Sequence, residues 1–401
     1  MTSVLVAADN HYYRDAKGDV YVDSVFNYDF YKRYLSVFDK VYAVGRVTKV
    51  DSAPAGKKRA DGPGVEFLDL KPGRGLGGFV QTAVTNKKLV ATYLRKADCV
   101  ISRVPGVVAN MVVSECNRAN ISYSVEVVVD PWEYFAPEVR GGLVNWAVRR
   151  KWTSNLKKIC LNADGASYVT ERYLQKKYPC AALKGESGHF TGSYSSVELP
   201  DDGFAQERIY KPKDSILIAH AANNFDGNSK GHYTLFDAVK ILVLAGKDVR
   251  LLCIGDGPSM GDFKQYVAED GIDNRVEFTG RLADGAEVRR RMAEADVFVF
   301  PTKAEGLPRV VLEAMAEGMP CLSTPVCGIP EVLPADCLFA PNDAEGFARG
   351  ITEMLNNPDL MTRRSAENLV TAKQYSASKL NVKRKAFYQS VAATAVSRSR
   401  S

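Results

Sequence analysis

The stretch VFVFPTKAEGLPRVVLEAMAEG, residues 297–318, decides the fold of this chain. Its first four residues form a short apolar run of β-branched and aromatic side chains, which predicts a buried strand. Pro308 suits the first position of a helix and Gly318 suits its C-terminal stop, so a helix is expected between them. This order places Glu305 in the loop ahead of the helix and Glu313 inside it.

A strand that leads into a helix is a natural site for an anionic ligand, because the free amides and the helix dipole both point to it. Acidic side chains beside such a site are useful only if they contact neutral hydroxyl groups. Carboxylates accept well from paired hydroxyls, and the hydroxyls of a sugar or a ribose are the obvious donors. Glu305 and Glu313 therefore indicate a ligand that carries both phosphate and sugar.

Short apolar runs alternate with helical segments on both sides of this stretch. In the second half of the chain this alternation predicts a parallel sheet covered by helices. Strands are expected there at 215–219, 249–254, 276–278, 297–300 and 320–323, and helices at 233–245, 262–270, 286–295 and 308–317.

The first half has a similar pattern, with strands expected at 4–8, 41–44, 65–68, 99–101, 123–129 and 166–170, and helices at 23–38, 80–95, 107–119, 145–161 and 171–174. Residues 51–64 are rich in Gly, Pro, Lys and Arg and are predicted to be an exposed loop. Residues 185–213 have few periodic apolar residues and are predicted to connect two domains.

The composition fits a soluble protein of two domains. A length of 401 residues and a hydrophobic fraction of 46% allow two cores, and a net charge of +6 favours anionic partners without indicating nucleic acid. The eight cysteines form no C-x-x-C pair and the four histidines show no metal spacing, so we expect a reduced, cytoplasmic protein with no metal site. The N-terminus has the character of a strand rather than a signal peptide, and no apolar run approaches the roughly 20 residues of a spanning helix.

Seven residues separate Glu305 from Glu313, and this spacing resembles the E-x7-E signature of the retaining glycosyltransferases of family four. The later GIPEV, residues 328–332, also resembles that family. The resemblance implies an α/β chain with the GT-B fold, in which two Rossmann-like parallel-sheet domains face each other across a cleft. It also implies that Glu305 contacts the transferred sugar and that Glu313 contacts the nucleotide ribose.

The same resemblance implies that the chain is divided into three parts. Residues 1–205 would form the acceptor-side domain, residues 206–375 the nucleotide-sugar-binding domain, and residues 376–401 a terminal helix that returns to the first domain. The nearest type within the family is the bacterial capsule, exopolysaccharide or lipopolysaccharide enzyme.

Lys230 lies at the predicted start of a helix and resembles the lysine that this family places there. Alone it would be an ordinary surface lysine, but at this position it reinforces the attraction of the helix dipole for phosphate. The arginine that the family usually has a few residues earlier is absent from 220–224. Either Arg281 or Arg103 is expected to compensate, or backbone amides contribute more of the binding.

The donor-binding set is completed by two loops. The amides of Gly306, Leu307 and Arg309 are expected to stabilise the diphosphate. Arg281 and Leu282 follow the strand over 276–278 and resemble the family loop that lies against the base. The turn GDGP, residues 255–258, is predicted to be structural, because G-x-G alone is a weak sign of a nucleotide site.

Asp130 ends the strand over 123–129, where the family commonly has a histidine close to the transferred sugar. It is either an acceptor-side polar group, which would make it a catalytic candidate beside Glu305 and Lys230, or a turn residue that ends the strand.

Two further stretches have both a functional and a structural interpretation. The helix over 145–161 combines Trp146 and Trp152 with basic side chains, so it would either contact an anionic bilayer surface or present a solvated face above a buried aromatic stripe. Residues 73–78 contain four glycines and would be either a mobile loop near the substrates or a flexible turn before a helix.

The reaction implied is glycosyl transfer with retention, from a nucleotide-diphosphate sugar, UDP- or GDP-linked, to a saccharide or lipid-linked saccharide. No metal, other cofactor or nucleic acid is expected, and contact with the inner face of the membrane would be peripheral. Alternatives on the same fold are a phosphorylase, a nucleotide-sugar epimerase and a non-catalytic nucleotide-sugar-binding subunit. A dinucleotide oxidoreductase is disfavoured, because no G-x-G-x-x-G follows the first strand.

Overall fold

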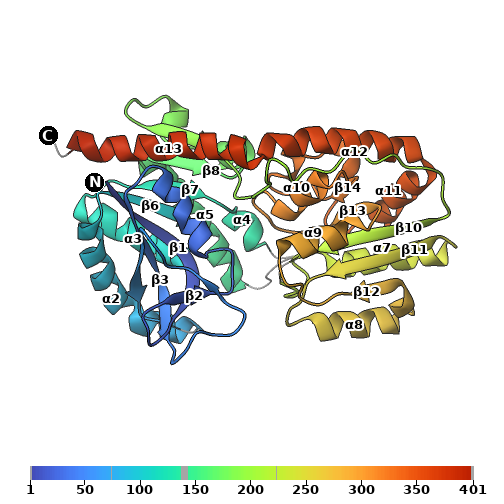
Figure 1. Cartoon of the computed structure of the whole chain (residues 1–401), viewed down its shortest axis with the longest axis horizontal. Helices are drawn as coiled ribbons and strands as arrows, with labels where there is room; N and C mark the ends of the chain where they lie inside the picture. The colour runs from blue at the N-terminus through green and yellow to red at the C-terminus, as the bar shows by residue number, and fades with distance from the viewer. Residues whose placement is uncertain (1, 74, 137–142, 223, 399–401) are drawn as a thin grey trace.

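The computed structural model describes residues 2–73, 75–136, 143–222 and 224–398. They form two α/β lobes side by side, and helix α13 (Ala377–Arg398) runs along the first lobe, so the last segment of the chain packs on the first (Figure 1).

The first lobe is built on a parallel sheet with the order β5-β3-β1-β6-β7-β8-β9. Except between β3 and β5, its strands alternate in sequence with helices, as the apolar pattern predicts. The strands are β1 (Ser3–Arg14), β3 (Lys40–Lys49), β5 (Val65–Leu70), β6 (Cys99–Val104), β7 (Ser124–Val127), β8 (Gly165–Tyr168) and β9 (Phe190–Ser193). The helices are α1 (Tyr28–Lys32), α2 (Gly75–Tyr93), α3 (Val107–Ala119), α4 (Pro131–Tyr134), α5 (Leu143–Asn162) and α6 (Tyr173–Lys177).

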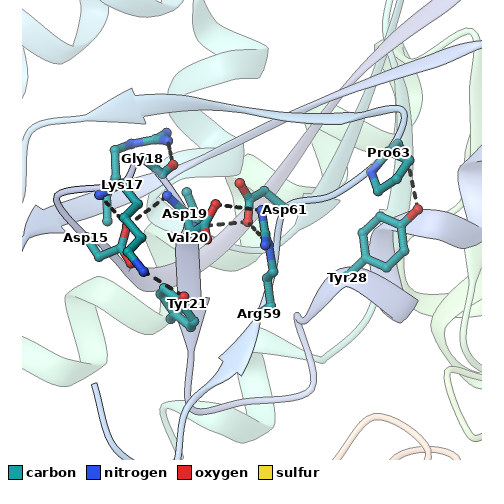
Figure 2. Close-up of polar contacts among 11 residues, drawn as sticks. Asp15, Lys17, Gly18, Asp19, Val20, Tyr21, Tyr28, Arg59, Asp61 and Pro63 are labelled. Carbon is teal, nitrogen blue, oxygen red and sulfur yellow. Dashed lines mark hydrogen bonds and ion pairs between the residues drawn. The ribbon is translucent and has the colours of Figure 1, made fainter. Parts of the chain in front are cut away.

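An antiparallel branch extends from β1 through β2 (Val20–Val22) and β4 (Lys58–Arg59). Figure 2 shows the carboxylates that hold its turns together. Asp61 accepts from the Val20 amide and from the Arg59 guanidinium, both at 3.0 Å, and Arg59 also bonds Asp19 at 2.6 Å. The exposed loop predicted over 51–64 is therefore partly a strand.

The second lobe is a five-stranded parallel sheet with the order β12-β11-β10-β13-β14. The strands are β10 (Ser215–Ala221), β11 (Asp248–Ile254), β12 (Val276–Phe278), β13 (Val297–Phe300) and β14 (Cys321–Ser323). The helices are α7 (His232–Leu244), α8 (Met260–Glu269), α9 (Gly285–Ala293), α10 (Arg309–Ala316), α11 (Ala344–Asn356) and α12 (Pro358–Ala372).

Several predictions for the chain ends and connections are corrected by the structure. The helix expected over 23–38 is a short α1 followed by a 3-10 turn, and the connection expected over 185–213 contains β9. The glycines within 75–78 lie in the first turn of α2, so they form neither a loop near the substrates nor a turn that precedes the helix. Arg74 lies outside the described residues. Helices α11 and α12 were not predicted.

The linker and the terminal helix tie the lobes together. The Ala205 amide donates to the Ala316 carbonyl at 2.9 Å, and Arg208 donates to the carbonyls of Glu317 and Ala295. After α12 the chain crosses back, and Tyr388 of α13 is fully buried in the first lobe, stacked on Tyr34 with 4.6 Å between ring centroids.

Glu331 of the second lobe caps a helix of the first. Its carboxylate accepts from the amides of Glu171, Arg172 and Tyr173 at 2.6, 3.0 and 2.6 Å. These amides begin α6, where the first N–H groups of a helix have no partner within the helix. The lobes are therefore joined by hydrogen bonds to a charged acceptor, which are stronger than neutral ones.

Replacing this carboxylate should loosen the contact between the lobes. We expect Glu331→Ala to lower the free energy of unfolding by about 1–3 kcal/mol, the cost of leaving amides without their acceptor. Urea unfolding measures the change. Glu345→Ala, at a side chain that is 81% exposed, is the control and should have little effect. Equal stability of the two variants would contradict this role for Glu331.

Candidate active site

Lys230 lies in the loop between β10 and α7, directly before Gly231, whose φ is +75°. A Cβ on Gly231 would lie 2.0 Å from the Pro301 carbonyl oxygen, so only glycine allows this close approach of two loops. The Lys303 amide also donates to the Ser229 carbonyl at 2.9 Å. The loops after β10 and β13 are thus fixed to each other at the carboxyl ends of adjacent strands, where ligands bind in open α/β sheets.

Lys230 and Glu305 form an ion pair across these two loops. Both side chains are partly buried, and the lysine nitrogen lies 5.9 Å from the centre of the Phe300 ring. The structure thus brings together two of the candidate catalytic residues. Such a pair can hold a positive charge beside a phosphate and a hydrogen-bond acceptor beside a sugar.

Glu313 lies on α10, the helix that follows the loop of Glu305. Its side chain forms no hydrogen bond or ion pair with any residue that the structure describes. Burial raises the pKa of Glu313, although Arg309 and Arg289 act in the opposite direction. A partly buried carboxylate without a donor is a costly arrangement unless a ligand supplies donors.

Helix α10 begins one residue later than predicted, because Pro308 is its N-cap and Arg309 its first residue. Gly318 ends it at a φ of +66°, as predicted. The amides of Gly306, Leu307 and Arg309 donate to no acceptor among the described residues. They remain available to an anion in front of the helix.

Gly306 brings this loop against the first lobe. A Cβ at this position would lie 2.2 Å from the Val128 carbonyl oxygen and 3.2 Å from Val169. Gly328 packs behind it, and its amide donates to the Gly306 carbonyl at 2.9 Å. The loop that carries Glu305 is therefore in direct contact with the ends of β7 and β8.

Arg281 and Leu282 follow β12, next to the turn that begins at Gly255. Gly255 and Gly280 form an isolated bridge, which brings the two loops together. A Cβ on Gly255 would lie 2.1 Å from the Ala222 carbonyl oxygen, so this turn packs on the loop after β10, and the expectation that GDGP is structural fits this contact. Arg281 is exposed and Leu282 is partly buried. Asn223 lies outside the described residues.

Asp130 is enclosed by neighbouring residues of the first lobe. It has no exposed surface, and its oxygens accept from the Trp132 amide and from the hydroxyls of Tyr173 and Tyr178. Lys177 adds an ion pair at 2.5 Å. The carboxylate caps α4 and fixes the end of β7, so the interpretation as a residue that ends the strand fits these contacts and the interpretation as an acceptor-side group does not.

Arg103, which was expected as one possible replacement for the missing arginine, is buried in the first lobe and paired with Glu126. Within the part of the chain that the structure describes, no three His, Cys, Asp or Glu side chains are placed to hold a metal ion. All eight cysteines are buried and free. Among the described helices, none has the length and apolar character needed to cross a membrane.

Two buried histidines behind Lys230 were not predicted to belong to the site. The ring of His220 is stacked on Phe300, donates from Nδ1 to the Val299 carbonyl and lies 4.6 Å from the ring of His232. Burial lowers the pKa of His220 to about 4 and that of His232 to about 2, and Lys230 contributes to both shifts. Both rings are therefore neutral at pH 7. The only sequence signal that could have placed these histidines in the site is the closeness of His232 to Lys230 along the chain.

Comparisons with known proteins agree with this geometry. Residues 216–357 match the family model described as "Glycosyl transferases group 1". Protein CapJ of Staphylococcus aureus is 26% identical over 361 residues, which cover 89% of this chain and 86% of that protein. The N-acetyl-alpha-D-glucosaminyl L-malate synthase of Bacillus anthracis is 35% identical over 116 residues, or 28% of this chain and 30% of that protein.

Solved structures are similar over both lobes. Sucrose-phosphate synthase from Thermosynechococcus elongatus has a TM-score of 0.71 at 14% identity, covering 98% of this chain and 100% of that chain. HepE of Anabaena in complex with UDP and glucose has a TM-score of 0.64 at 15% identity, covering 97% and 100%. The chain therefore has the two-lobed GT-B fold of glycosyltransferases. The match to the group 1 glycosyl transferase model lies within its second lobe.

The raised pKa of Glu313 gives a prediction for the free protein. Because the folded state favours the protonated form, the ionised carboxylate lowers stability at pH values above its pKa. Glu313→Gln should therefore be more stable than the parent at about pH 8 and equally stable below about pH 4, where both folded and unfolded states are protonated.

The same variant should bind a donor roughly ten- to a hundredfold more weakly, since hydrogen bonds to a charged acceptor are lost. Urea unfolding at the two pH values and donor titration measure the two effects. A variant that is less stable at high pH and binds donor normally would refute a ligand-binding role for Glu313.

Proposed function

We propose that this chain is a retaining glycosyltransferase that moves a sugar from a nucleotide-diphosphate sugar to a saccharide or lipid-linked saccharide acceptor. The observation that carries the proposal is the Lys230–Glu305 ion pair, in the loop where Gly306 contacts the first lobe, followed by a helix that holds Glu313 with its side chain unpartnered. Similarity to the lipopolysaccharide core biosynthesis glycosyltransferase LpsE of Rhizobium meliloti, which is 35% identical over 148 residues, supports a role in the synthesis of a surface polysaccharide.

The donor would bind across the three loops of the second lobe. Lys230 and the free amides of Gly306 and Leu307 would hold the diphosphate, Glu313 would accept from the ribose hydroxyls, and Glu305 would accept from the sugar. The base would lie against Arg281 and Leu282, and the structure of HepE with UDP and glucose supports a UDP-type donor on this fold. Neutral His220 and His232 leave Lys230 as the positive charge of the loop.

The reaction would depend on stabilising the charge of the leaving diphosphate. The bond from the anomeric carbon to the diphosphate oxygen breaks, the acceptor hydroxyl forms its bond on the same face, and its proton goes to the departing phosphate. Lys230 and the amides would favour this step electrostatically, without a bound metal. A retaining glycosidase uses a carboxylate near the anomeric carbon as its nucleophile. Glu313 would be bound to the ribose, so it could not act as that nucleophile. Asp130 would act only by fixing the end of β7.

Substitution of the ion pair tests the proposal. We expect Lys230→Met and Glu305→Gln each to lower kcat by about 10²–10³, the cost of removing one group that stabilises charge in the transition state. The measurement is acceptor-dependent release of free nucleotide in the presence of a chelator, with the donor base chosen beforehand by thermal shift.

Lys264→Met, at an exposed lysine of α8, is the matched control and should keep full activity. Unchanged turnover in both ion-pair variants would overturn the assignment. If the donor binds but no sugar is transferred to any acceptor-containing extract, a non-catalytic nucleotide-sugar-binding subunit would be favoured instead.

We also propose peripheral contact with an anionic membrane through α5. The side chain of Trp146 is 54% exposed, and Arg150 lies 4.9 Å from its ring centre. Exposed Lys157 and Lys158 continue the basic face, whereas Trp152 packs on Phe135 with 5.6 Å between ring centroids. A basic face with an exposed aromatic ring suits the headgroup region of a bilayer.

Removing two of these charges should weaken membrane binding. At about 1 kcal/mol for each lysine, Lys157→Gln/Lys158→Gln should lower affinity for vesicles containing phosphatidylglycerol by roughly thirtyfold in a sedimentation assay. The matched control is Lys87→Gln/Lys88→Gln, which removes two exposed lysines from α2. Equal loss in both pairs would argue against a specific contact through α5.

A further inference from the structure

The two central strands of the second sheet, β10 and β13, separate at their carboxyl ends. Within the described residues, β10 pairs with β11 as far as Ala221 but with β13 at Ile218 and Ala219 alone. From β10 the chain continues to β11 and β12 on one side, and from β13 to β14 on the other. Ligands of open α/β sheets bind where the strand order reverses in this way. A side chain placed directly after Ala219 can therefore influence the proposed donor site.

His220 links the two strands at the point where their backbone pairing ends. Its Nδ1 atom donates to the Val299 carbonyl at 2.9 Å, because a carbonyl can only accept. On the other side of β13, the Ser323 hydroxyl donates to the Phe300 carbonyl at 2.6 Å. Neither side chain has any exposed surface. The last two carbonyls of β13 are thus held by side chains from both neighbouring strands, which fixes the direction in which the chain leaves toward Glu305.

The ring of His220 makes a second kind of contact with β13. It is stacked on the Phe300 ring with 5.5 Å between centroids, and the ring of His232 packs on it at 72° and 4.6 Å. The Lys230 ammonium lies 5.9 Å from the centre of the same Phe300 ring. His220 and Lys230 therefore both lie against the residue from which the loop of Glu305 departs.

Few side chains could make both contacts without adding a charge. Among the aromatic side chains, only histidine and tryptophan carry an N–H group on the edge of the ring. Burial lowers the pKa of His220 to about 4, and Lys230 adds to this shift, so the ring is neutral at pH 7. The other ring nitrogen, Nε2, is buried without a hydrogen-bond partner among the described residues. Because an unsatisfied buried acceptor lowers stability, a histidine at this position is better explained by the site than by the core.

A displacement of the end of β13 would reach the ion pair through short connections. Pro301 follows β13 directly, and its carbonyl oxygen would be 2.0 Å from a Cβ on Gly231. Two residues later, the Lys303 amide donates to the Ser229 carbonyl at 2.9 Å. Lys230 is the residue between Ser229 and Gly231, so the loop that carries it cannot move independently of the end of β13.

We propose that His220 is a positioning residue, which holds Val299 and Phe300 so that Glu305 and Lys230 keep the relative placement needed for transfer. It acts through β13 rather than on the substrate. This inference rests on the proposed function, because the placement of the pair matters only if the pair takes part in the reaction.

Two substitutions separate the hydrogen bond of His220 from its ring. His220→Phe keeps a flat ring and removes the N–H, whereas His220→Asn removes the ring and places its amide nitrogen where Nδ1 was. We expect His220→Phe to lower kcat about tenfold and to change the KM for the donor less than about twofold, because misplacement of the pair affects the transition state more than donor binding. His220→Asn should recover most of the lost kcat. The measurement is acceptor-dependent release of free nucleotide.

His189 provides a matched control in the first lobe. Its Nδ1 also donates to a backbone carbonyl, that of Ala163 at 3.0 Å. His189→Phe loses the same kind of bond and should keep the kcat of the parent. His220→Gln, whose amide extends one bond too far, should behave as His220→Phe and replaces it if the apolar ring impairs folding. Equal kcat in the His189 and His220 variants, or no recovery in His220→Asn, would overturn the inference.

A double-mutant cycle with Lys230→Met distinguishes positioning from a general structural effect. If His220 acts through the ion pair, adding His220→Phe to Lys230→Met should lower kcat by less than about a further twofold, because the pair is already lost. A further tenfold loss would show that His220 acts independently and would contradict the proposal.

The single variant Lys230→Met reports on the proposed function itself. If Lys230→Met lowers kcat and His220→Phe does not, only the positioning role fails. If Lys230→Met turns over as the parent does, the proposed function fails.

Discussion

The structure depends on the close approach of two backbones at Gly306. Its α-carbon faces the Val128 carbonyl at a distance that leaves no room for a side chain, and Gly328 supports it from behind. Glu331 adds the second link by capping α6 from the opposite lobe. Because these contacts involve main-chain atoms, they fix the loop that carries Glu305 against the ends of β7 and β8. A donor held by the second lobe would then meet an acceptor held by the first without a long rearrangement.

The distribution of charge follows from the same arrangement. In the second lobe, Lys230 is paired with Glu305, while the buried histidines behind it stay neutral. In the first lobe, the guanidinium groups of Arg33 and Arg103 share the single carboxylate of Glu126. Positive charge therefore lies after β10 in the second lobe and near the end of β6 in the first.

Local signals predicted the second lobe well. The apolar strand at 297–300, the helix after Pro308 and the glycine stop at 318 are all encoded within a few residues, and the structure has each of them. The buried network around Glu126 could not be predicted in this way, because Glu126 meets Tyr34 and Tyr388 from positions 92 and 262 residues away. Asp130 was ambiguous for a similar reason, since its partners Tyr173, Lys177 and Tyr178 come from the segment after the next strand.

We propose that Glu313 and the Lys230–Glu305 pair hold the activated sugar at the junction of the lobes. A crystal structure of the chain with a non-hydrolysable nucleotide-diphosphate sugar tests it most directly. We expect ribose hydroxyls within about 3 Å of the Glu313 carboxylate and the diphosphate between Lys230 and the amides of Gly306 and Leu307. A nucleotide bound elsewhere, with Glu313 still unpartnered, would contradict it.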